Sequence, residues 1–500
     1  MKLLRKFLLP SLLAALLLSV QVSAQEQMAR EISSMDLVAD RSNMAYPAWL
    51  FNGDQMGFQT CGEGASITLS SEEGIGSVYM IFNVSHEPYA VCNHDSGEEV
   101  ICGQENFLHD FLNLTELFGT APASVTISFG EKPVQLSEMR VFTEGQVPSE
   151  VQQWKLAPEE GVDLLVFPTH GDDEQLFFAG LLPYYAGEKG YEVQVAYSTD
   201  HHNYDTVRPH EMLNGLWACG VTNYPVFGPF PDYLTENEHN ALEMIKPSGF
   251  AEEDVRAFVV EQIRRFKPFV VVGHDLGGEY GHGFHRLYGR MVKEASEISM
   301  DPSVFPESAG KYGVWDVPKT YIHLYEENSL HMNWDVPLEH FDGMTAYEVC
   351  KKIGYPAHVS QYAGFAWYFA DQETAESIEE IGPCDYGLYR STVGEDEDKN
   401  DLFENLLCRK EMKHREEEKK KAEEAEQKRL REEEKRKQQE AQAQAEKEQA
   451  QREADRIAQE QMREEANGRR EKMLFIFGFG IAGVLAFSVL LAVLLRKVRR

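Results

Sequence analysis

Two short segments of the sequence place acidic and imidazole side chains at a spacing that suits metal chemistry. The first covers residues 166–174 and reads VFPTHGDDE after an apolar stretch. His170 would end a strand and Asp173 would lie one turn into the next helix. A nitrogen and an oxygen could then lie ~2 Å from one divalent ion, with Asp172 free beside it. In the simpler alternative, the acids only stabilise the first turn of that helix through its dipole.

The second segment covers residues 273–285 and reads GHDLGGEYGHGFH. Its glycines allow a tight loop in which the backbone approaches a ligand. His282 and His285 are then three residues apart at the start of a helix, so both side chains share one face. A lone histidine is usually structural, but this pair can supply the third metal ligand that the first segment lacks.

The surrounding pattern indicates how these segments are positioned. Apolar, β-branched stretches at 162–167, 191–198 and 269–272 predict strands, and 210–219 and 252–266 predict amphipathic helices. Such alternation favours a mostly parallel sheet with helices on both faces. Ligands of such sheets bind at the carboxyl ends of the strands, where both polar segments begin.

The HGDDE of residues 170–174, together with the GEYGHGFH of residues 278–285, resembles the zinc-dependent deacetylase family of PIG-L and LmbE proteins. That family's pattern is HPDDE followed by a later HxxH. The resemblance runs from about Asp163 to Ile298. It implies a Rossmann-like α/β catalytic domain over residues 151–408 that removes the acetyl group from N-acetylglucosamine-type sugars or glycans.

The resemblance implies a metal and a base. Zn2+ would be bound by His170, Asp173 and His285, and Asp172 would act as general base. Three protein ligands leave a coordination position for water, whose pKa zinc lowers from ~15.7 towards ~7. Asp172 would take the proton as hydroxide attacks the amide carbonyl.

Further residues match family positions. His282 would assist as an acid or electrostatic partner, protonating the departing amine as an imidazolium. Tyr280 stands at a catalytic tyrosine position and would stabilise the oxyanion. Substrate-pocket positions of relatives match Arg208, Glu211 and Asp232. These last three could equally be ordinary helix and turn residues.

The sequence departs from the family pattern at two places. Gly171 stands where the family usually has proline, and Gly283-Phe284 replaces Pro-Asp inside the HxxH. Neither change removes a ligand, but both alter the loops that surround the metal. Residues 358–361, which read HVSQ, are similar to a late family element to which the sequence assigns no role.

Residues 25–150 precede the catalytic domain and show another pattern. Between residues 50 and 145, short apolar stretches alternate with turn residues, which predicts a β-sandwich. The stretch resembles discoidin-type, galactose-binding-like domains. This implies carbohydrate binding, although a purely structural domain is equally compatible with the pattern.

The ends of the chain predict export and membrane anchoring. Residues 1–24 have the basic start, apolar run and small residues of a signal peptide. Residues 473–495 lack charge and are long enough to cross the ~30 Å hydrocarbon core as a transmembrane helix. Because residues 496–500 are basic, they would stay in the cytoplasm as a tail, leaving the rest outside the cell membrane. A buried helix is the alternative for residues 473–495.

A charged segment, residues 409–472, joins the catalytic domain to the apolar helix. Its Glu and Lys residues recur four apart, which stabilises a solitary helical stalk, and a partly disordered tether is the alternative. Apolar residues are too sparse for a coiled-coil seam. Small residues four apart in the apolar helix also suggest a homodimer contact: Gly478, Ala482 and Ala486.

Charge and cysteine content restrict the remaining possibilities. The net charge of −34 would repel phosphate backbones, so nucleic-acid binding is excluded. Of the seven cysteines, Cys92 with Cys102 is the first choice for a disulfide, followed by Cys350 with Cys384.

The sequence leaves two rivals to a membrane-anchored deacetylase. One is a surface glycan-binding protein, a lectin or adhesin, whose catalytic unit is weak or dead. The other is a structural spacer that docks proteins through its acidic surface. Bound zinc would favour the enzyme, because a dead site has no physical need to keep four converging polar groups.

Overall fold

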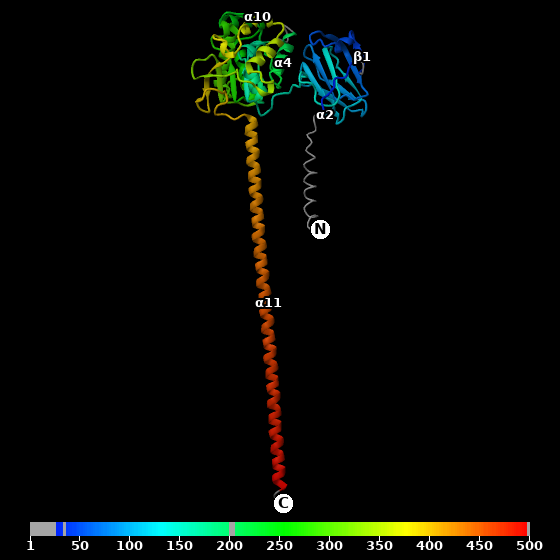
Figure 1. Ribbon diagram of the computed structural model, residues 1–500, viewed down its shortest axis with the longest axis vertical. Helices are drawn as coiled ribbons and strands as arrows, with labels where there is room; N and C mark the ends of the chain where they lie inside the picture. Colours follow the sequence, from blue (N-terminus) through cyan, green and yellow to red (C-terminus); the bar gives the residue numbers. More distant parts are fainter. Residues whose placement is uncertain (1–26, 34–36, 200–205, 498–500) are drawn as a thin grey trace, which may run out of the picture. The chain divides into compact units, whose positions relative to one another are not determined.

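The computed structural model describes residues 27–33, 37–199 and 206–497 (Figure 1). The predicted signal peptide, residues 1–24, lies outside the described residues, as do the last three residues of the predicted tail. The chain forms two compact units, Met1–Met412 and Lys413–Arg500. The first unit contains two sheets, and the second consists of one helix.

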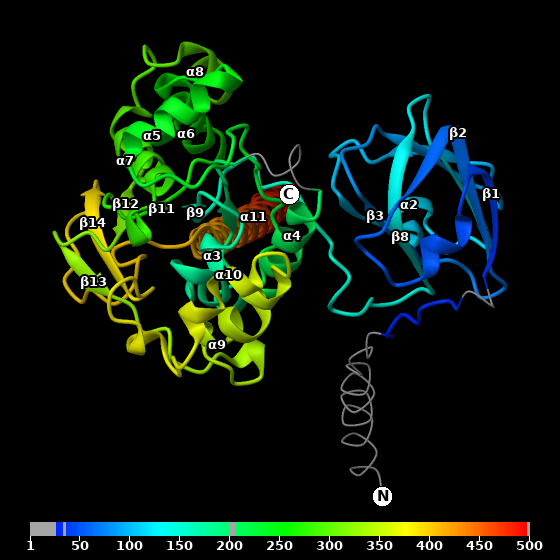
Figure 2. The same cartoon turned by 90° about the horizontal axis from the view of Figure 1, so that it is seen from above.

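The N-terminal sheet has eight antiparallel strands in the order β5-β4-β7-β2-β8-β3-β6, with β1 beside β2 (Figure 2). Buried side chains alternate with partly exposed ones along β4 and β7, as expected where one face of a strand covers the core. The elements are β1 (Val38–Met44), η1 (Pro47–Phe51), β2 (Gln59–Ser70), β3 (Ser77–Phe82), β4 (Tyr89–Asn93), β5 (Glu99–Cys102), β6 (His109–Asn113), α2 (Leu114–Phe118), β7 (Ser124–Ser128) and β8 (Val134–Phe142).

One long strand connects the two parts of this sheet. Residues 66–70 of β2 pair with β7, whereas residues 59–61 pair with β8. The described strands are therefore hydrogen-bonded into one continuous sheet, and side chains from both of its parts fill one apolar cluster. The predicted β-sandwich and its galactose-binding-like relationship stay predictions.

The second sheet has six strands in the order β10-β9-β11-β12-β14-β13. Its strands are β9 (Leu164–Phe167), β10 (Val193–Val195), β11 (Val270–Gly273), β12 (Lys319–His323), β13 (Ser329–His331) and β14 (Asp385–Ser391). The first four are parallel, which confirms the predicted parallel sheet for them. β14 is antiparallel to both its neighbours, which the sequence analysis did not predict. The sheet is therefore mixed.

Both faces of the parallel strands are buried. In β9, Leu164 and Val166 pack into one apolar cluster, whereas Leu165 and Phe167 pack into another. Such strands read as continuous apolar runs rather than alternating ones. The helical segments of this domain are α3 (Asp173–Leu176), η2 (Pro183–Glu188), α4 (Arg208–Ala218), α5 (Glu238–Ile245), η3 (Lys246–Ser248), α6 (Glu252–Phe266), η4 (Glu279–Gly281), α7 (Gly283–Ile298), α8 (Pro306–Tyr312), η5 (Glu339–Phe341), α9 (Ala346–Val349), η6 (Cys350–Gly354), η7 (Tyr355–Ala357), α10 (Tyr362–Phe369) and η8 (Ala375–Ser377).

The N-terminal sheet contacts the α/β domain, residues 151–408, through buried side chains of β3, of β6 and of Phe107 just before β6. The Phe107 ring stacks on Tyr224 with 4.5 Å between centroids. His109 Nε2 lies 2.8 Å from His210 Nδ1 on α4, and His109 Nδ1 lies 2.6 Å from the Tyr79 hydroxyl. The N-terminal domain thus helps to position α4, the helix that begins at the candidate site.

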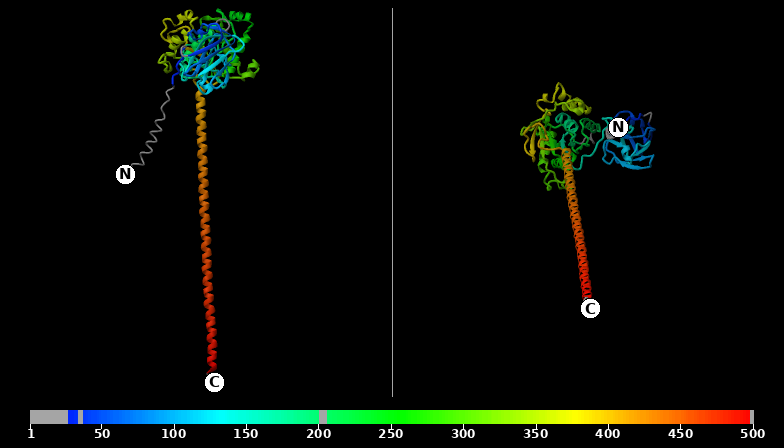
Figure 3. Two further views of the ribbon diagram at one scale, coloured as in Figure 1. Left: turned by 90° about the vertical axis from the view of Figure 1, so that its right-hand side faces the viewer. Right: turned by 60° about the horizontal axis from the view of Figure 1, so that its bottom comes forward.

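The second unit continues a single helix, α11 (Arg409–Lys497) (Figure 3). The predicted stalk is therefore helical rather than disordered. Among the described residues, α11 is the one helix long and apolar enough to cross a membrane, a property of its length and composition. The homodimer contact through its small residues stays a prediction.

Both predicted disulfides are wrong, because all seven cysteines are free thiols. In the β4–β5 pair, Cys102 lies opposite Tyr89 and Cys92 lies opposite Glu99. The two cysteines are offset by three positions, about 10 Å along a strand, which exceeds the ~7 Å Cα separation that a disulfide spans. Cys350 Sγ instead accepts a hydrogen bond from the backbone N–H of Gly180.

Candidate metal and active site

Two neighbouring strands deliver the polar segments to one edge of the sheet. β9 and β11 are parallel, and Phe167 at the end of one pairs with Gly273 at the end of the other. The loops that follow therefore leave the sheet side by side. The first leads into α3 and the second into α7, as the sequence predicted.

Three predicted ligands converge at this edge. His170 Nδ1 lies 3.0 Å from His285 Nε2, and each nitrogen lies 3.3 Å from an oxygen of Asp173. Tetrahedral ligands ~2.0–2.1 Å from one zinc ion lie about 3.3 Å apart, so the spacing fits a common ion. Two imidazole nitrogens and one carboxylate oxygen are also a donor set that zinc accepts. The residues therefore fit the implied metal.

The backbone fixes the Asp173 carboxylate. Its Oδ2 accepts hydrogen bonds from the N–H groups of Thr169 and His170, at 3.0 and 2.7 Å. Oδ1 is left facing His285. Burial works to raise the pKa of Asp173, but His285 and His170 outweigh it and hold that pKa well below its ordinary value. The carboxylate is therefore ionised and available to a cation.

Two other histidines lie close to the three ligands. His282 offers a nitrogen within 4.8 Å of those of His170 and His285, so it is an alternative ligand. His274 forms a similar group with Asp173 and His285. However, His274 Nε2 lies 2.9 Å from the N–H of Thr169, and its Nδ1 lies 2.7 Å from Glu279. Both ring nitrogens of His274 are thus engaged, which suits a positioning role.

Asp172 lies beside the ligands in a strained conformation. Its φ of 150° is in a region that favours glycine. The strained backbone is held by a 3.0 Å hydrogen bond from its N–H to Glu174. Burial raises the pKa of Asp172 to about 7, against the opposing charge of Arg208, whose guanidinium lies 3.8 Å away. A carboxyl with a pKa near neutrality can both accept and return a proton.

The predicted acid, His282, differs from expectation. Burial, with the neighbouring His170 and His285, lowers the pKa of His282 to about 3. The ring is therefore neutral at pH 7, and the expected imidazolium is not supported. Tyr280 lies over the ligands, with its ring centroid 5.4 Å from that of His285. Burial raises the pKa of the Tyr280 phenol, so the phenol stays protonated and can donate a hydrogen bond.

The three predicted substrate residues have different surroundings. Arg208 donates a hydrogen bond to the Gly171 carbonyl beside the ligand loop. Asp232 Oδ1 lies 3.2 Å from His170 Nε2, where a carboxylate orients a metal-binding histidine. Glu211 is fully buried and accepts hydrogen bonds from the N–H and hydroxyl of Ser360. Glu211 therefore anchors another segment of the chain.

That segment is the HVSQ element, residues 358–361. His358 Nε2 lies 3.0 Å from Glu174 Oε1, while Glu174 Oε2 accepts the hydrogen bond from the N–H of Asp172. With the Ser360–Glu211 contact, the element fastens both α3 and α4. The structure thus gives this element a positioning role behind Asp172.

Comparison with known proteins agrees with this geometry. Residues 164–296 match the family model for PIG-L, GlcNAc-PI de-N-acetylase. Residues 164–296 are named the PIG-L domain after the family that they match. The match includes the three ligands, Asp172 and both loops, and it confirms the family resemblance for this part of the chain.

Individual relatives cover less of the protein. The domain is similar to 1D-myo-inositol 2-acetamido-2-deoxy-alpha-D-glucopyranoside deacetylase 1 of Catenulispora acidiphila, with 31% identity over 25% of this chain and 38% of the relative. The Streptomyces scabiei deacetylase of the same substrate is 26% identical over 32% of this chain and 55% of its own. The chain thus spans between about two fifths and a little over half of the length of these relatives. N,N'-diacetylchitobiose deacetylase from Pyrococcus horikoshii aligns with 16% identity and a TM-score of 0.31, over 46% of this chain and 84% of its own.

Close packing accounts for both glycines that depart from the family pattern. A Cβ on Gly171 would lie 2.4 Å from the Met212 side chain. A Cβ on Gly283 would lie 2.3 Å from the backbone oxygen of Asn237 and from the Thr235 hydroxyl. Neighbouring segments therefore approach the two loops of the PIG-L domain closely. Neither departure removes a predicted ligand.

Glu279 is the main functional residue that the sequence analysis missed. Its carboxylate lies 2.7 Å from His274 Nδ1, 3.0 Å from His285 Nδ1 and 2.8 Å from His323 Nδ1. Burial works to raise the pKa of Glu279, but these histidines outweigh it and hold that pKa well below its ordinary value. Glu279 is therefore placed to orient the predicted ligand His285 through Nδ1, while Nε2 faces His170 and Asp173.

The substitution Glu279→Gln should weaken zinc binding about 10- to 100-fold while all three ligands remain. The reason is that a neutral amide stabilises the ligand His285 less than a carboxylate does. Zinc affinity would be measured by competition with a chromophoric chelator. Glu326→Gln, at an exposed position of the same domain, is the control. Equal zinc affinity for wild type and Glu279→Gln would contradict the positioning role.

Proposed function

We propose that the protein is a zinc-dependent deacetylase that hydrolyses the N-acetyl group of N-acetylglucosamine-type sugars or glycans. The observation that carries the proposal is the convergence of His170, Asp173 and His285 beside the unliganded Asp172. The PIG-L match and the deacetylase activity for which the relatives are named support the same reaction class.

Residues of the chain would transfer the protons and stabilise the charge that develops on the amide oxygen. Zinc bound to the three ligands would supply Lewis acidity to a water and to the amide oxygen. Asp172 takes a proton from the attacking water, and the Tyr280 phenol donates a hydrogen bond to the oxygen that gains charge. Asp172 then returns its proton to the leaving nitrogen. One amide and one water become one amine and one carboxylic acid.

His282 has a different role in this scheme from the one first expected. Because its ring is neutral, it cannot protonate the amine directly, and its Nδ1 is buried without a hydrogen-bond partner among the described residues. A neutral ring that faces both metal-binding histidines can accept a hydrogen bond from bound substrate or water. We assign His282 to orienting the reacting groups.

We also propose that this enzyme is held at the outside of a cell membrane by the apolar part of α11. What supports the proposal is the length and composition of that helix and the basic residues that follow it. The charged part of α11 would then separate the PIG-L domain from the lipid surface. A glycan outside the cell would be the substrate.

An amine-release assay tests the proposed reaction. Zinc-loaded protein would be incubated with N-acetylglucosamine, its inositol glycoside and chitin oligosaccharides, and primary amine and acetate would be measured. We expect equal amounts of both products from at least one substrate. Activity should disappear with a chelator and return with zinc but not with magnesium. No release from any member of the panel would overturn the proposal and favour a glycan-binding protein.

A further inference from the structure

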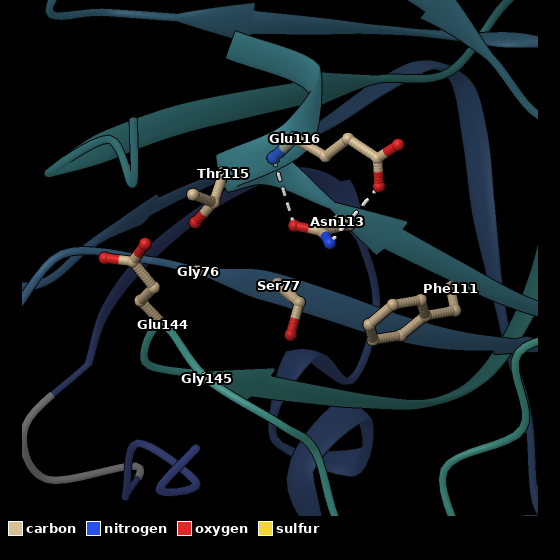
Figure 4. Close-up of a pocket in the computed structure, with 8 residues that line it drawn as sticks. All are labelled: Gly76, Ser77, Phe111, Asn113, Thr115, Glu116, Glu144 and Gly145. Atoms are coloured by element: carbon tan, nitrogen blue, oxygen red, sulfur yellow. Dashed lines mark hydrogen bonds between the residues drawn. The ribbon is translucent and has the colours of Figure 1, made fainter. Parts of the chain in front are cut away.

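A polar hollow of about 340 Å³ opens at one end of the N-terminal sheet (Figure 4). It lies where β3 begins and where β6 and β8 end. Its lining consists of Gly76, Ser77, Phe111, Asn113, Thr115, Glu116, Glu144 and Gly145. Its size is within the lower part of the ~300–1,000 Å³ range of small-molecule sites.

Two hydroxyl groups in this hollow have no hydrogen-bond partner among the residues that the structure describes. Ser77 is only 4% exposed, and its Oγ is buried and unpaired. Thr115 Oγ1 is likewise buried and unpaired. Buried polar atoms almost always have a hydrogen-bond partner in native proteins. We therefore expect a ligand that enters the hollow to form hydrogen bonds with these two hydroxyl groups. A hydroxyl can donate and accept, which suits a ligand rich in hydroxyl groups.

The charge of the hollow restricts that ligand. Glu116 and Glu144 contribute carboxylates, and the lining contains no basic residue. Asn113 caps α2 by accepting a hydrogen bond from the N–H of Glu116, and it donates to that carboxylate at 3.4 Å. Glu144 forms no ion pair among the described residues, so its charge is available to a ligand. An anionic ligand is excluded, and a cationic one is favoured.

The hollow also has an apolar side and a closely packed wall. Figure 4 shows the Phe111 ring and the Glu144 carboxylate on opposite sides of Ser77. A Cβ on Gly76 would lie 2.4 Å from the backbone nitrogen of Glu144, so the two segments that form the wall are in close contact. An aromatic face beside hydroxyl and carboxylate groups can receive a sugar ring, whose C–H groups pack on the aromatic surface.

We infer that this hollow binds an amino-sugar unit whose nitrogen carries a free ammonium group. The ammonium would pair with Glu144, the sugar hydroxyls with Ser77 and Thr115, and one ring face with Phe111. This inference rests on the proposed function, because N-deacetylation creates such an ammonium group. The N-terminal domain would then hold the product form of the glycan in preference to the neutral acetylated form.

Binding of two matched oligosaccharides tests this inference. The full chain carrying His285→Ala would be titrated calorimetrically with a glucosamine hexamer and an N-acetylglucosamine hexamer, so that the metal site contributes as little as possible. We expect the glucosamine hexamer to bind at least tenfold more tightly than the acetylated hexamer. That affinity should fall as salt rises, because the Glu144 contact is an exposed ion pair.

Substitutions in the lining of the hollow test whether the glucosamine hexamer binds there. Glu144→Gln and Ser77→Ala, each added to the same chain, should weaken binding of the glucosamine hexamer at least tenfold. Glu131→Gln, an exposed acid elsewhere in the same domain, should not. Equal affinity for both hexamers, no binding of either, or full affinity after Glu144→Gln would overturn the inference. These results are independent of catalysis, because amine release by wild type tests the proposed function separately.

Discussion

The substitution His285→Ala should remove zinc from the protein and lower kcat/KM for an N-acetylated sugar by about a thousandfold or more. His285 Nε2 lies 3.0 Å from His170 Nδ1 and 3.3 Å from Asp173, so its loss leaves two of the three ligands. The Lewis acidity of a bound metal lowers the activation free energy of such a hydrolysis by several kcal/mol, and each ~1.4 kcal/mol changes the rate tenfold. Zinc per chain would be measured by mass spectrometry after dialysis, together with activity.

A second histidine provides the control for this change. His323 is also fully buried and also contacts Glu279, at 2.8 Å, but it belongs to no candidate ligand group among the described residues. His323→Ala creates a comparable cavity, so any general loss of stability should appear in both variants. We expect His323→Ala to retain zinc. Zinc retained in full by His285→Ala would show that His170, Asp173 and His282 form the ligand set instead.

The convergence of the three predicted ligands could be foreseen because short local segments of the sequence carry them. His170 and Asp173 lie three residues apart between the end of β9 and the start of α3, and His285 lies in the first turn of α7. Predicting where the strands end and the helices begin was therefore enough to predict that the three side chains lie close together. The parallel strands were predictable for a similar reason. β9 and β11 are buried on both faces, which leaves a continuous apolar run in the sequence.

The residues behind the ligands could not be predicted in this way. Glu279 acquires its role from His274, His285 and His323, and the last of these is distant in sequence and lies at the end of another strand. A glutamate inside a glycine-rich loop carries no local signal of such contacts. The pairing of Glu211 with Ser360 is equally remote in sequence. These contacts depend on the tertiary fold.

The protonation state of His282 and the edge strand β13 could not be predicted from the sequence either. His282 would titrate near its ordinary value in an open loop, but burial and two neighbouring histidines lower its pKa to about 3. β13 is three residues long with one buried side chain, so it lacks a detectable pattern. It is nevertheless positioned by its pairing with β14. Both features follow from neighbours that only the folded chain provides.

The substitution Asp172→Asn should lower kcat about 10²- to 10⁴-fold, with KM and zinc content little changed. Asp172 is the proposed base, yet it belongs to neither the His170–His282–His285 group nor the Asp173–His274–His285 group, so the ion should stay bound. Asparagine has nearly the same volume as aspartate and tolerates positive φ better than most residues, which matters at a φ of 150°. The amide cannot accept the proton from water.

The pattern of losses distinguishes a base from a structural residue. A residue needed only for folding would change zinc content and stability together with kcat, whereas loss of a base affects the chemical step alone. Asp275→Asn is a suitable control, because Asp275 is a half-buried acid in the neighbouring loop whose pKa is also raised by burial. It should keep wild-type kcat. If Asp172→Asn retained more than a tenth of wild-type kcat with zinc bound, another group would have to take the proton, and His282, neutral and facing both histidine ligands, would be the residue to test next.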